Sequence, residues 1–243
     1  GTYAILVKIN GLEEYGYAVK IFTILPCPVT VEWSGVDFEN GFTYDGAAHS
    51  VTVAAKIASS DNGNVTGSAA DANLSVSITK DGASAGEVKI AGDYTLTATA
   101  GNSNYYISSG ETTSFTVEKA PLTVTVNDKT ITYGDTVTFS ESDITIKGFA
   151  GGETASVLGG AATFMHEYEQ FSNAGTYTVT ASGLTSENYE ITYQQGTLTV
   201  SKKDLTVKVK DCAITYGDDK PDFELEYNGF VNGETSAVLS GAP

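Results

Sequence analysis

The sequence contains no arginine: all 13 basic residues are lysine, and they face 30 acidic residues, which gives a formal net charge of -17. Arginine supplies the planar guanidinium group that grips phosphates and guanine bases through paired hydrogen bonds. A strongly negative surface also repels polyanions such as nucleic acid and anionic membranes. We therefore expect no nucleic-acid partner. A surface of this charge suits a soluble protein in a crowded extracellular setting.

Long apolar runs are also missing. No run approaches the roughly 20 residues that a helix needs to cross a bilayer. We expect no membrane insertion within this segment. The sequence shows no signal peptide or sorting tail, and because it starts and stops inside repeated motifs, it reads as a piece of something longer.

Cysteine and histidine are scarce. The two cysteines, Cys27 and Cys212, fall in different repeats, so we expect two unpaired thiols rather than a disulfide within each module. The two histidines, His49 and His166, have neither the spacing nor the neighbours of metal ligands. No Gly-x-Ser-x-Gly motif or comparable signature points to a nucleophile. We therefore expect no catalytic residue, cofactor or metal, and the protein should not be an enzyme.

One loop and several strand ends leave chemical alternatives open. Asp61-Asn62-Gly63-Asn64 offers oxygen atoms to calcium, but it lacks the spaced carboxylates and closing glutamate of a known calcium loop, which favours a solvated loop. Lys119, Lys147 and Lys202 stand near predicted strand ends, where a lysine could form an amide with an asparagine or aspartate side chain. An intact-mass measurement would reveal such a bond.

The sequence does contain a repeat. Tyr216-Gly217-Asp218 follows Tyr133-Gly134-Asp135 by 83 residues, and Ala174-Gly175-Thr176-Tyr177 follows Ala91-Gly92-Asp93-Tyr94 by the same 83. Chance matches would not share one offset. Gly229 to Thr235 follows Gly148 to Thr154 by 81, so two residues have been lost in a loop.

The repeat divides the chain into four parts. We predict the closing strands of a truncated module over 1–27, a β-module over 28–119, a second over 120–201 (the middle repeat), and the opening half of a truncated module over 202–243 (the final repeat). Pro26-Cys27-Pro28 separates the first two parts, and its prolines should stop strand pairing there.

Within each part, short alternating segments predict strands. Leu122–Val126, Val29–Trp33 and Tyr189–Tyr193 are examples, and Asp81-Gly82 predicts a hairpin. Glu153–Leu158 is the one helix candidate of the middle repeat, and it is too short to be stable alone. The predicted fold class is mainly β, an elongated tandem array of small β-modules with little helix. The modules could be immunoglobulin-like sandwiches or β-grasp-like.

At these motifs the chain resembles the MBG domain of the YGX type. The resemblance rests on Tyr133-Gly134-Asp135, Gly148-Phe149, Gly152-Glu153-Thr154, Asn188-Tyr189 and Gly196 to Val200, and it is close over 120–201 and 204–241 and looser over 28–119. Such modules occur in tandem in large bacterial surface and secreted proteins, including adhesins. The resemblance implies an extracellular repeat, and it brings no set of ligand residues with it.

The recurring tyrosines have a structural explanation. Tyr94, Tyr177, Tyr105 and Tyr189 recur from repeat to repeat, whereas a specific site needs to appear only once. A tyrosine also combines a large apolar ring with a hydroxyl group that can reach the backbone. We therefore expect these residues to pack within their modules.

Two functions remain. The first is a non-catalytic adhesive or spacer stalk on a bacterial surface, with host or matrix glycans and proteins as possible partners. The second is an array of carbohydrate-binding modules attached to a secreted glycoside hydrolase, with Trp33, Tyr105 and Tyr106 as the candidate ligand contacts. The incomplete modules over 1–27 and 202–243 also suggest head-to-tail self-association through open strand edges.

Overall fold

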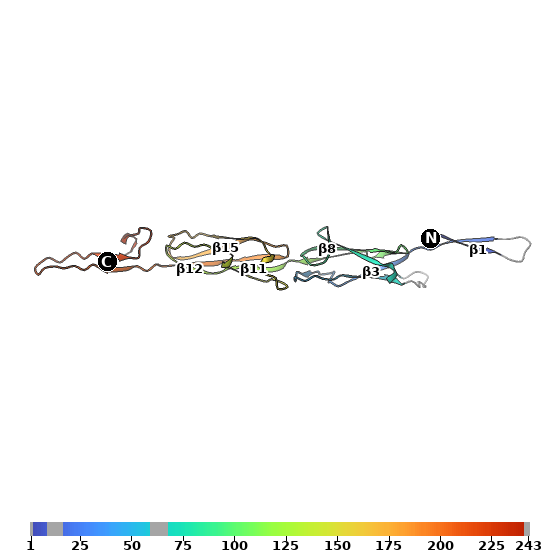
Figure 1. Cartoon of the computed structure of the whole chain (residues 1–243), viewed down its shortest axis with the longest axis horizontal. Coiled ribbons are helices and arrows are strands. Elements are labelled where there is room, and N and C mark those ends of the chain that lie inside the picture. The colour runs from blue at the N-terminus through green and yellow to red at the C-terminus, as the bar shows by residue number, and fades with distance from the viewer. Residues whose placement is uncertain (1, 9–16, 59–67, 241–243) are drawn as a thin grey trace, which may run out of the picture. The chain divides into compact units, whose positions relative to one another are not determined.

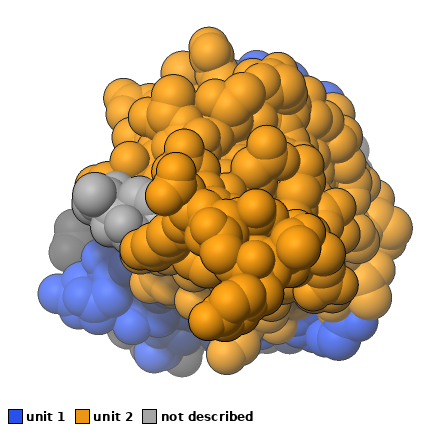
Figure 2. Space-filling view, turned by 90° about the vertical axis from the view of Figure 1, so that its left-hand side faces the viewer, with its two compact units in different colours: residues 1–120, 150–152 blue, residues 121–149, 153–243 orange. Residues whose placement is uncertain are grey.

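The computed structural model describes residues 2–8, 17–58 and 68–240, which fold into two compact units. Unit 1 comprises residues 1–120 and 150–152, and unit 2 comprises residues 121–149 and 153–243 (Figure 2). No helix in the described part of the chain is long and apolar enough to span a membrane.

Unit 1 contains a hairpin and two sheets (Figure 1). The hairpin pairs β1 (Thr2–Lys8) antiparallel with β2 (Tyr17–Thr23). The larger sheet has the order β4-β10-β8-β6-β7 and consists of β4 (Phe42–Thr43), β6 (Leu74–Lys80), β7 (Ala83–Ala85), β8 (Gly92–Ala100) and β10 (Thr112–Glu118). The smaller has the order β5-β3-β9 and consists of β3 (Cys27–Ser34), β5 (Thr52–Ile57) and β9 (Tyr105–Ser109). A 3-10 turn, η1 (Ala69–Ala72), precedes β6.

The core of unit 1 follows the two-residue period of its strands. In β8 the buried side chains are Tyr94, Leu96 and Ala98, and the threonines between them lie on the other face. Phe115 of the neighbouring β10 stacks on Tyr94, with ring centroids 5.5 Å apart. The alternation in the sequence therefore places one face of each strand in the core.

The predicted hairpin at Asp81-Gly82 is present. Asp81 has φ 49° and Gly82 has φ 82°, so both central residues adopt the left-handed conformation of a type I′ turn. Lys80 pairs with Ala83 directly across the turn. The returning strand is β7, which begins directly after Gly82.

Strand pairing is interrupted before Pro26, as predicted, since β2 ends at Thr23, but the prediction is wrong for Pro28, because pairing resumes at Cys27. β3 begins at Cys27, which pairs with Tyr105 in a parallel register, and Pro28 pairs with Tyr106. The Pro28 carbonyl accepts a hydrogen bond from Ala58 N–H over 3.1 Å. Pro28 lies at the start of the strand, where a missing backbone donor costs a single terminal hydrogen bond.

Unit 2 contains two sheets built by the middle repeat, together with a small sheet from the final repeat (Figure 1). The first has the order β13-β11-β16, with β11 (Ala120–Val126), β13 (Ile144–Lys147) and β16 (Tyr189–Gln194). The second has the order β12-β17-β15-β14, with β12 (Lys129–Thr132), β14 (Gly159–His166), β15 (Gly175–Thr185) and β17 (Gly196–Ser201). The final repeat pairs β18 (Thr206–Val209) antiparallel with β19 (Leu225–Asn228).

The two sheets of the middle repeat share one core. Val126 comes from β11, Val179 from β15, and Leu198 and Val200 from β17, and all four side chains are buried in a single cluster. Tyr168, which lies in a loop, closes the cluster. Because strands from both sheets supply this core, the middle repeat is a two-layer β-sandwich.

In the residues that the structure describes, helical structure is limited to short 3-10 turns. The candidate helix Glu153–Leu158 is reduced to η3 (Ala155–Val157), and the other turns of unit 2 are η2 (Glu141–Asp143) and η4 (Ser236–Val238). The prediction of a mainly β chain with several small sheets is confirmed. The two-layer core of the middle repeat has the arrangement of a sandwich.

The shared core gives a direct stability prediction. Leu198 is fully buried in it, so Leu198→Ala should lower the free energy of unfolding by about 3 kcal/mol, as expected for a core leucine whose cavity relaxes only partly. Met165 of β14 is 73% exposed, and Met165→Ala should change the unfolding free energy by less than about 0.5 kcal/mol. Urea denaturation of both variants measures the difference, and equal losses would contradict the shared core.

Candidate functional site

Each of the two histidines bonds to a group within its own unit. His49 lies in unit 1, where Nε2 is 3.1 Å from the Asp45 carboxylate. His166 lies in unit 2, where Nδ1 is 3.1 Å from the Tyr168 carbonyl oxygen. Among the described residues there is no group of three or more His, Cys, Asp or Glu side chains that could hold a metal ion.

The other chemical candidates from the sequence are the two cysteines and one possible calcium loop. Cys27 is half-buried and Cys212 is exposed, and both are free thiols. The possible calcium loop, Asp61-Asn62-Gly63-Asn64, falls in 59–67, outside the described residues.

The three candidate glycan contacts do not share one surface. Trp33 lies on the face of β3 that also carries the buried Val29, and its indole N–H donates a hydrogen bond to the Gly110 carbonyl over 2.8 Å. Tyr105 and Tyr106 are consecutive residues of β9, so their side chains point to opposite faces of the sheet. Tyr106 is 50% exposed. The arrangement therefore does not form one flat aromatic platform from all three.

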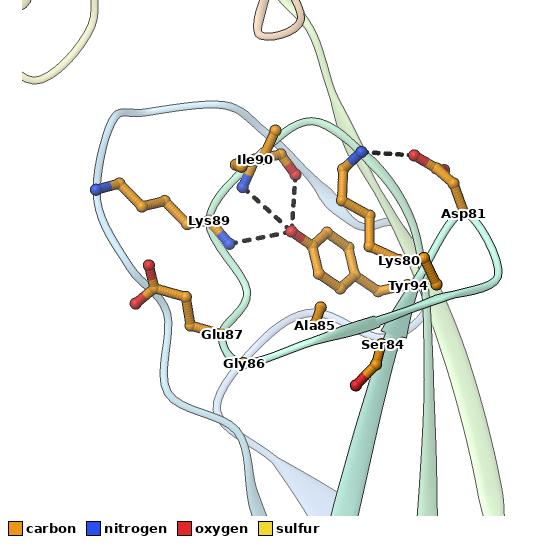
Figure 3. Close-up of a pocket in the computed structure, with 10 residues that line it drawn as sticks. Lys80, Asp81, Ser84, Ala85, Gly86, Glu87, Lys89, Ile90 and Tyr94 are labelled. Atoms are coloured by element: carbon orange, nitrogen blue, oxygen red, sulfur yellow. Dashed lines mark hydrogen bonds and ion pairs between the residues drawn. The ribbon is translucent and has the colours of Figure 1, made fainter.

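The hydroxyl groups of the tyrosines in the repeated Ala-Gly-x-Tyr motif bond to backbone groups of residues just upstream in the chain. The Tyr94 hydroxyl donates to the Ile90 carbonyl over 2.9 Å and accepts from the N–H groups of Lys89 and Ile90 (Figure 3). The Tyr177 hydroxyl donates to the Asn173 carbonyl, again four residues upstream, over 2.7 Å. This is the geometry of a tyrosine corner, in which the hydroxyl fixes the chain entering a strand. The motif therefore has a structural role in both units.

A second tyrosine motif forms a tight corner, here named the Tyr-Gly corner and comprising Thr132 to Asp135. The Asp135 N–H donates to the Thr132 carbonyl over 2.9 Å, and the Thr132 N–H donates to the Asp135 carboxylate over 3.0 Å. Gly134 has φ 92°, which residues with a Cβ adopt at a cost. The Tyr133 N–H donates to the Ser201 carbonyl, which fixes the corner to the end of β17.

The Tyr-Gly corner of the middle repeat contacts the final repeat, and both lie within unit 2. The Tyr133 hydroxyl donates to Glu234 Oε1 over 2.5 Å. A Cβ at Gly134 would lie 3.2 Å from Val231 Cγ2, so the missing side chain gives Val231 its space. The hydrogen bond to the Glu234 carboxylate, together with burial, raises the pKa of Tyr133 above its ordinary value of 10.0, because the neighbouring negative charge disfavours the phenolate.

Glu234 belongs to a sharp turn, here named the Gly-Glu-Thr turn and comprising 229–235. Asn232 has φ 55° and Gly233 has φ 72°, and the Glu234 N–H donates to the Val231 carbonyl over 3.0 Å. The turn therefore presents the Val231 and Glu234 side chains to the corner from one short segment. A groove of about 650 Å³ lies beside this contact, and Lys202 and Lys203 contribute to its walls.

The equivalent turn of the middle repeat, 148–154, uses its glutamate within its own repeat. The Tyr189 hydroxyl donates to Glu153 Oε2 over 2.5 Å. Tyr189 is buried, and its ring meets that of Phe149 edge to face with centroids 5.6 Å apart. The two equivalent glutamates therefore make different bonds. Glu153 accepts from a tyrosine of its own repeat, and Glu234 accepts from the corner tyrosine of the preceding repeat.

Unit 1 contains a contact of the same kind at backbone level. Residues 150–152 group with unit 1, and a Cβ at Gly46 would lie 3.1 Å from Gly151 Cα. Gly46 follows Tyr44 and Asp45, the residues that stand in place of Tyr-Gly-Asp in this repeat, and has φ 82°. The Tyr44 N–H donates to the Glu118 carbonyl, as Tyr133 does to Ser201. Within unit 1, residues 150–152 therefore lie close to Gly46.

The final repeat has a Tyr-Gly corner of its own at 215–218. The Asp218 N–H donates to the Thr215 carbonyl over 3.0 Å, and the Thr215 N–H donates to the Asp218 carboxylate over 2.7 Å. Gly217 has φ 101°. These features reproduce the corner of Tyr133, but the Tyr216 side chain is fully exposed to solvent.

The sequence did not identify Tyr133, Gly134 and Glu234 as partners. The repeat pattern predicts these motifs as turn and strand residues of single modules. The available signal was that Tyr-Gly-Asp and Gly-Glu-Thr recur together, in the middle repeat and again in the final one. Repetition alone does not say that the turn of one copy contacts the corner of another.

The geometry defines a mainly β protein of several small sheets, in which the turn 229–235 of the final repeat contacts the corner of the middle repeat. Residues 122–199 and 205–243 match the family model of the MBG domain (YGX type), so this half of the chain consists of MBG repeats, as the sequence predicted. The family is a non-catalytic domain type and indicates a repeat domain of surface proteins. No curated protein matches the chain.

The contact between Gly134 and Val231 can be tested with a matched pair of glycines. Gly134→Ala and Gly217→Ala both place a Cβ at a positive φ, but only the first meets Val231, because nothing lies within 4 Å of Gly217. Proteolysis in the segment 202–240 should therefore be faster in Gly134→Ala than in Gly217→Ala, by roughly three- to tenfold. Equal rates in the two variants would show that Gly134 does not support the docked turn.

The hydrogen bond between Tyr133 and Glu234 predicts a titration. In the intact chain Tyr133 should ionise above pH 10.0, and Glu234→Gln should lower its pKa towards 10.0 because the neighbouring negative charge is gone. The stabilisation from the neutral phenol is complete below pH 10.0 and is lost as pH rises through the raised pKa. NMR titration of ¹³C-labelled tyrosine, assigned with Tyr133→Phe, measures both values. An unchanged midpoint in Glu234→Gln would exclude the bond in solution.

Proposed function

We propose that this chain is a non-catalytic repeat segment of a bacterial cell-surface or secreted protein, where it acts as an adhesive spacer stalk. The contact between Tyr133 and Glu234, which joins two MBG repeats, is the observation that carries the proposal. A spacer needs modules that fold separately and hold to their neighbours in a defined way.

The contact between the repeats is small and specific. The charge-assisted hydrogen bond restricts how the turn of the final repeat is oriented on the corner, since the Tyr133 hydroxyl must point at the Glu234 carboxylate. The Val231 side chain fills the space beside Gly134 and fixes a second point. Two different contacts restrict rotation about the link better than either contact alone. This arrangement suits a protein that must keep distance between its ends.

The strong negative charge of the chain suits the proposed location on a bacterial surface or outside the cell. A net charge of -17 keeps neighbouring stalks apart and soluble. Host or matrix glycans and proteins are the proposed partners of the adhesive function. The alternative of a carbohydrate-binding array would draw on Trp33, Tyr105 and Tyr106, which lie on different faces, so we favour the spacer.

Head-to-tail association of chains is part of the proposal. β1 and β2 pair with each other in a two-stranded sheet, and β18 and β19 do the same, so each sheet has open edges. Apolar side chains are exposed on the first pair, including Ile5, Val19 and Ile21. An edge of β18–β19 in one chain could therefore pair with an edge of β1–β2 in another.

Solution X-ray scattering tests the spacer. A single globule of 243 residues would have a radius of gyration of about 18 Å, and a string of separately folded modules should give a clearly larger value. A dilution series separates association, which raises the value with concentration, from extension, which does not. A radius at the globule figure at all concentrations would refute the spacer function.

A further inference from the structure

The Tyr-Gly corner of the final repeat, 215–218, repeats the geometry of the occupied corner at 132–135. In both corners the aspartate accepts from the threonine N–H, over 2.7 Å in the final repeat and 3.0 Å in the middle one. The central glycines have φ values of 101° and 92°. The corner of the final repeat is therefore already in the conformation that receives a turn.

The two corners differ in what covers the tyrosine. Tyr133 donates to Glu234, and Gly134 lies against Val231, so the turn 229–235 covers the first corner. Tyr216 is fully exposed, and a Cβ added at Gly217 would meet nothing within 4 Å. The Tyr133 ring also meets Phe171 of its own repeat, with centroids 6.4 Å apart, so its corner is covered from its own repeat as well as by the turn.

We propose that the Tyr216 corner is a docking site for the Gly-Glu-Thr turn of a further MBG repeat placed in tandem after the final repeat. The Tyr216 hydroxyl donates to the glutamate of that turn, and the missing side chain of Gly217 admits the residue equivalent to Val231. The inference rests on the proposed spacer function and names the partner of its junction. The occupant is chosen because the same chain shows this turn seated on the same corner.

One glutamate can serve both its own repeat and the preceding one. Glu153 accepts the Tyr189 hydroxyl of its own repeat on Oε2, and Glu234 accepts Tyr133 of the preceding repeat on Oε1. The two bonds use different oxygens of equivalent carboxylates, so they are compatible in one complete repeat. The internal tyrosine would then hold the carboxylate in place for the external one.

A second copy of the chain is a poorer occupant. Its Glu234 is bonded to Tyr133, and its Glu153 is bonded to Tyr189. Docking in trans would have to displace at least one such contact. A tandem repeat brings its own turn at high effective concentration and displaces nothing.

The test compares two extended chains built from the sequence itself. In the first, residues 160–201 are joined after Ser240, which completes the final repeat because Ser240 corresponds to Gly159. In the second, residues 160–243 are joined there, which adds a further repeat with its own turn. The two chains differ only in the proposed occupant. The comparison therefore separates docking from any burial of Tyr216 by the completed repeat.

The measurement is the rate at which tetranitromethane nitrates Tyr216, read by peptide mass spectrometry. The rate should fall at least about tenfold in the second chain relative to the first, since a charge-assisted hydrogen bond must open before the phenol reacts. Glutamate to glutamine in the appended turn alone should restore most of the rate. Tyr106, which is 50% exposed, is the internal control and should react equally in all chains.

Three outcomes would overturn the inference. Equal Tyr216 rates in the two extended chains would show that the corner does not take the turn. Protection that survives the glutamine substitution would show that something other than the carboxylate covers Tyr216. Tyr133 reports separately on the spacer function: if it reacts as fast as Tyr106 in every chain, the observed junction itself does not form in solution. Protection of Tyr216 in the unextended chain that depends on concentration would favour docking in trans and contradict the tandem occupant.

Discussion

The structure of the middle repeat depends on burying the inner faces of two narrow sheets against each other. Val126 comes from one sheet and Leu198 and Val200 from the other, and a single cluster holds them. A module of about 80 residues buries a smaller fraction of its surface than a larger domain does, so its core leaves little stability in reserve. Hydrogen bonds at the rim of the core, such as the tyrosine corner of Tyr177, then contribute a larger share of the stability because they fix the loops that close the core.

The same size limit explains how the repeats are joined. A large apolar interface would take side chains away from a core that has few to spare, and it would be exposed whenever a neighbour was absent. The contact between Tyr133 and Glu234 avoids this, because a phenol and a carboxylate are each tolerable in water. Gly134 adds close packing without adding apolar surface, since it is the absence of a side chain that admits Val231.

Much of the fold could be predicted because strand and turn chemistry is local. The positive φ values of Asp81 and Gly82 follow from the residues themselves, and the alternation of Leu122–Val126 survives as part of β11. Pro28 was misjudged because the cost of a missing N–H depends on where the strand lies in its sheet, which the sequence does not show. The partners of Tyr133 were missed because an offset measures likeness between repeats, whereas contact between them depends on the direction in which each turn points.

The position of the glutamate couples the folding of a repeat to its docking. Glu153 is held by Tyr189, a buried residue of the same repeat, so the carboxylate is oriented only when the sheets around that tyrosine have formed. A glutamate oriented in advance loses less side-chain entropy on accepting a second hydroxyl. Glu234 accepts the Tyr133 hydroxyl although 202–243 holds only the opening half of its repeat, so the internal tyrosine is not required for docking. In a complete repeat the internal bond would strengthen the attachment to the preceding repeat by orienting the carboxylate beforehand.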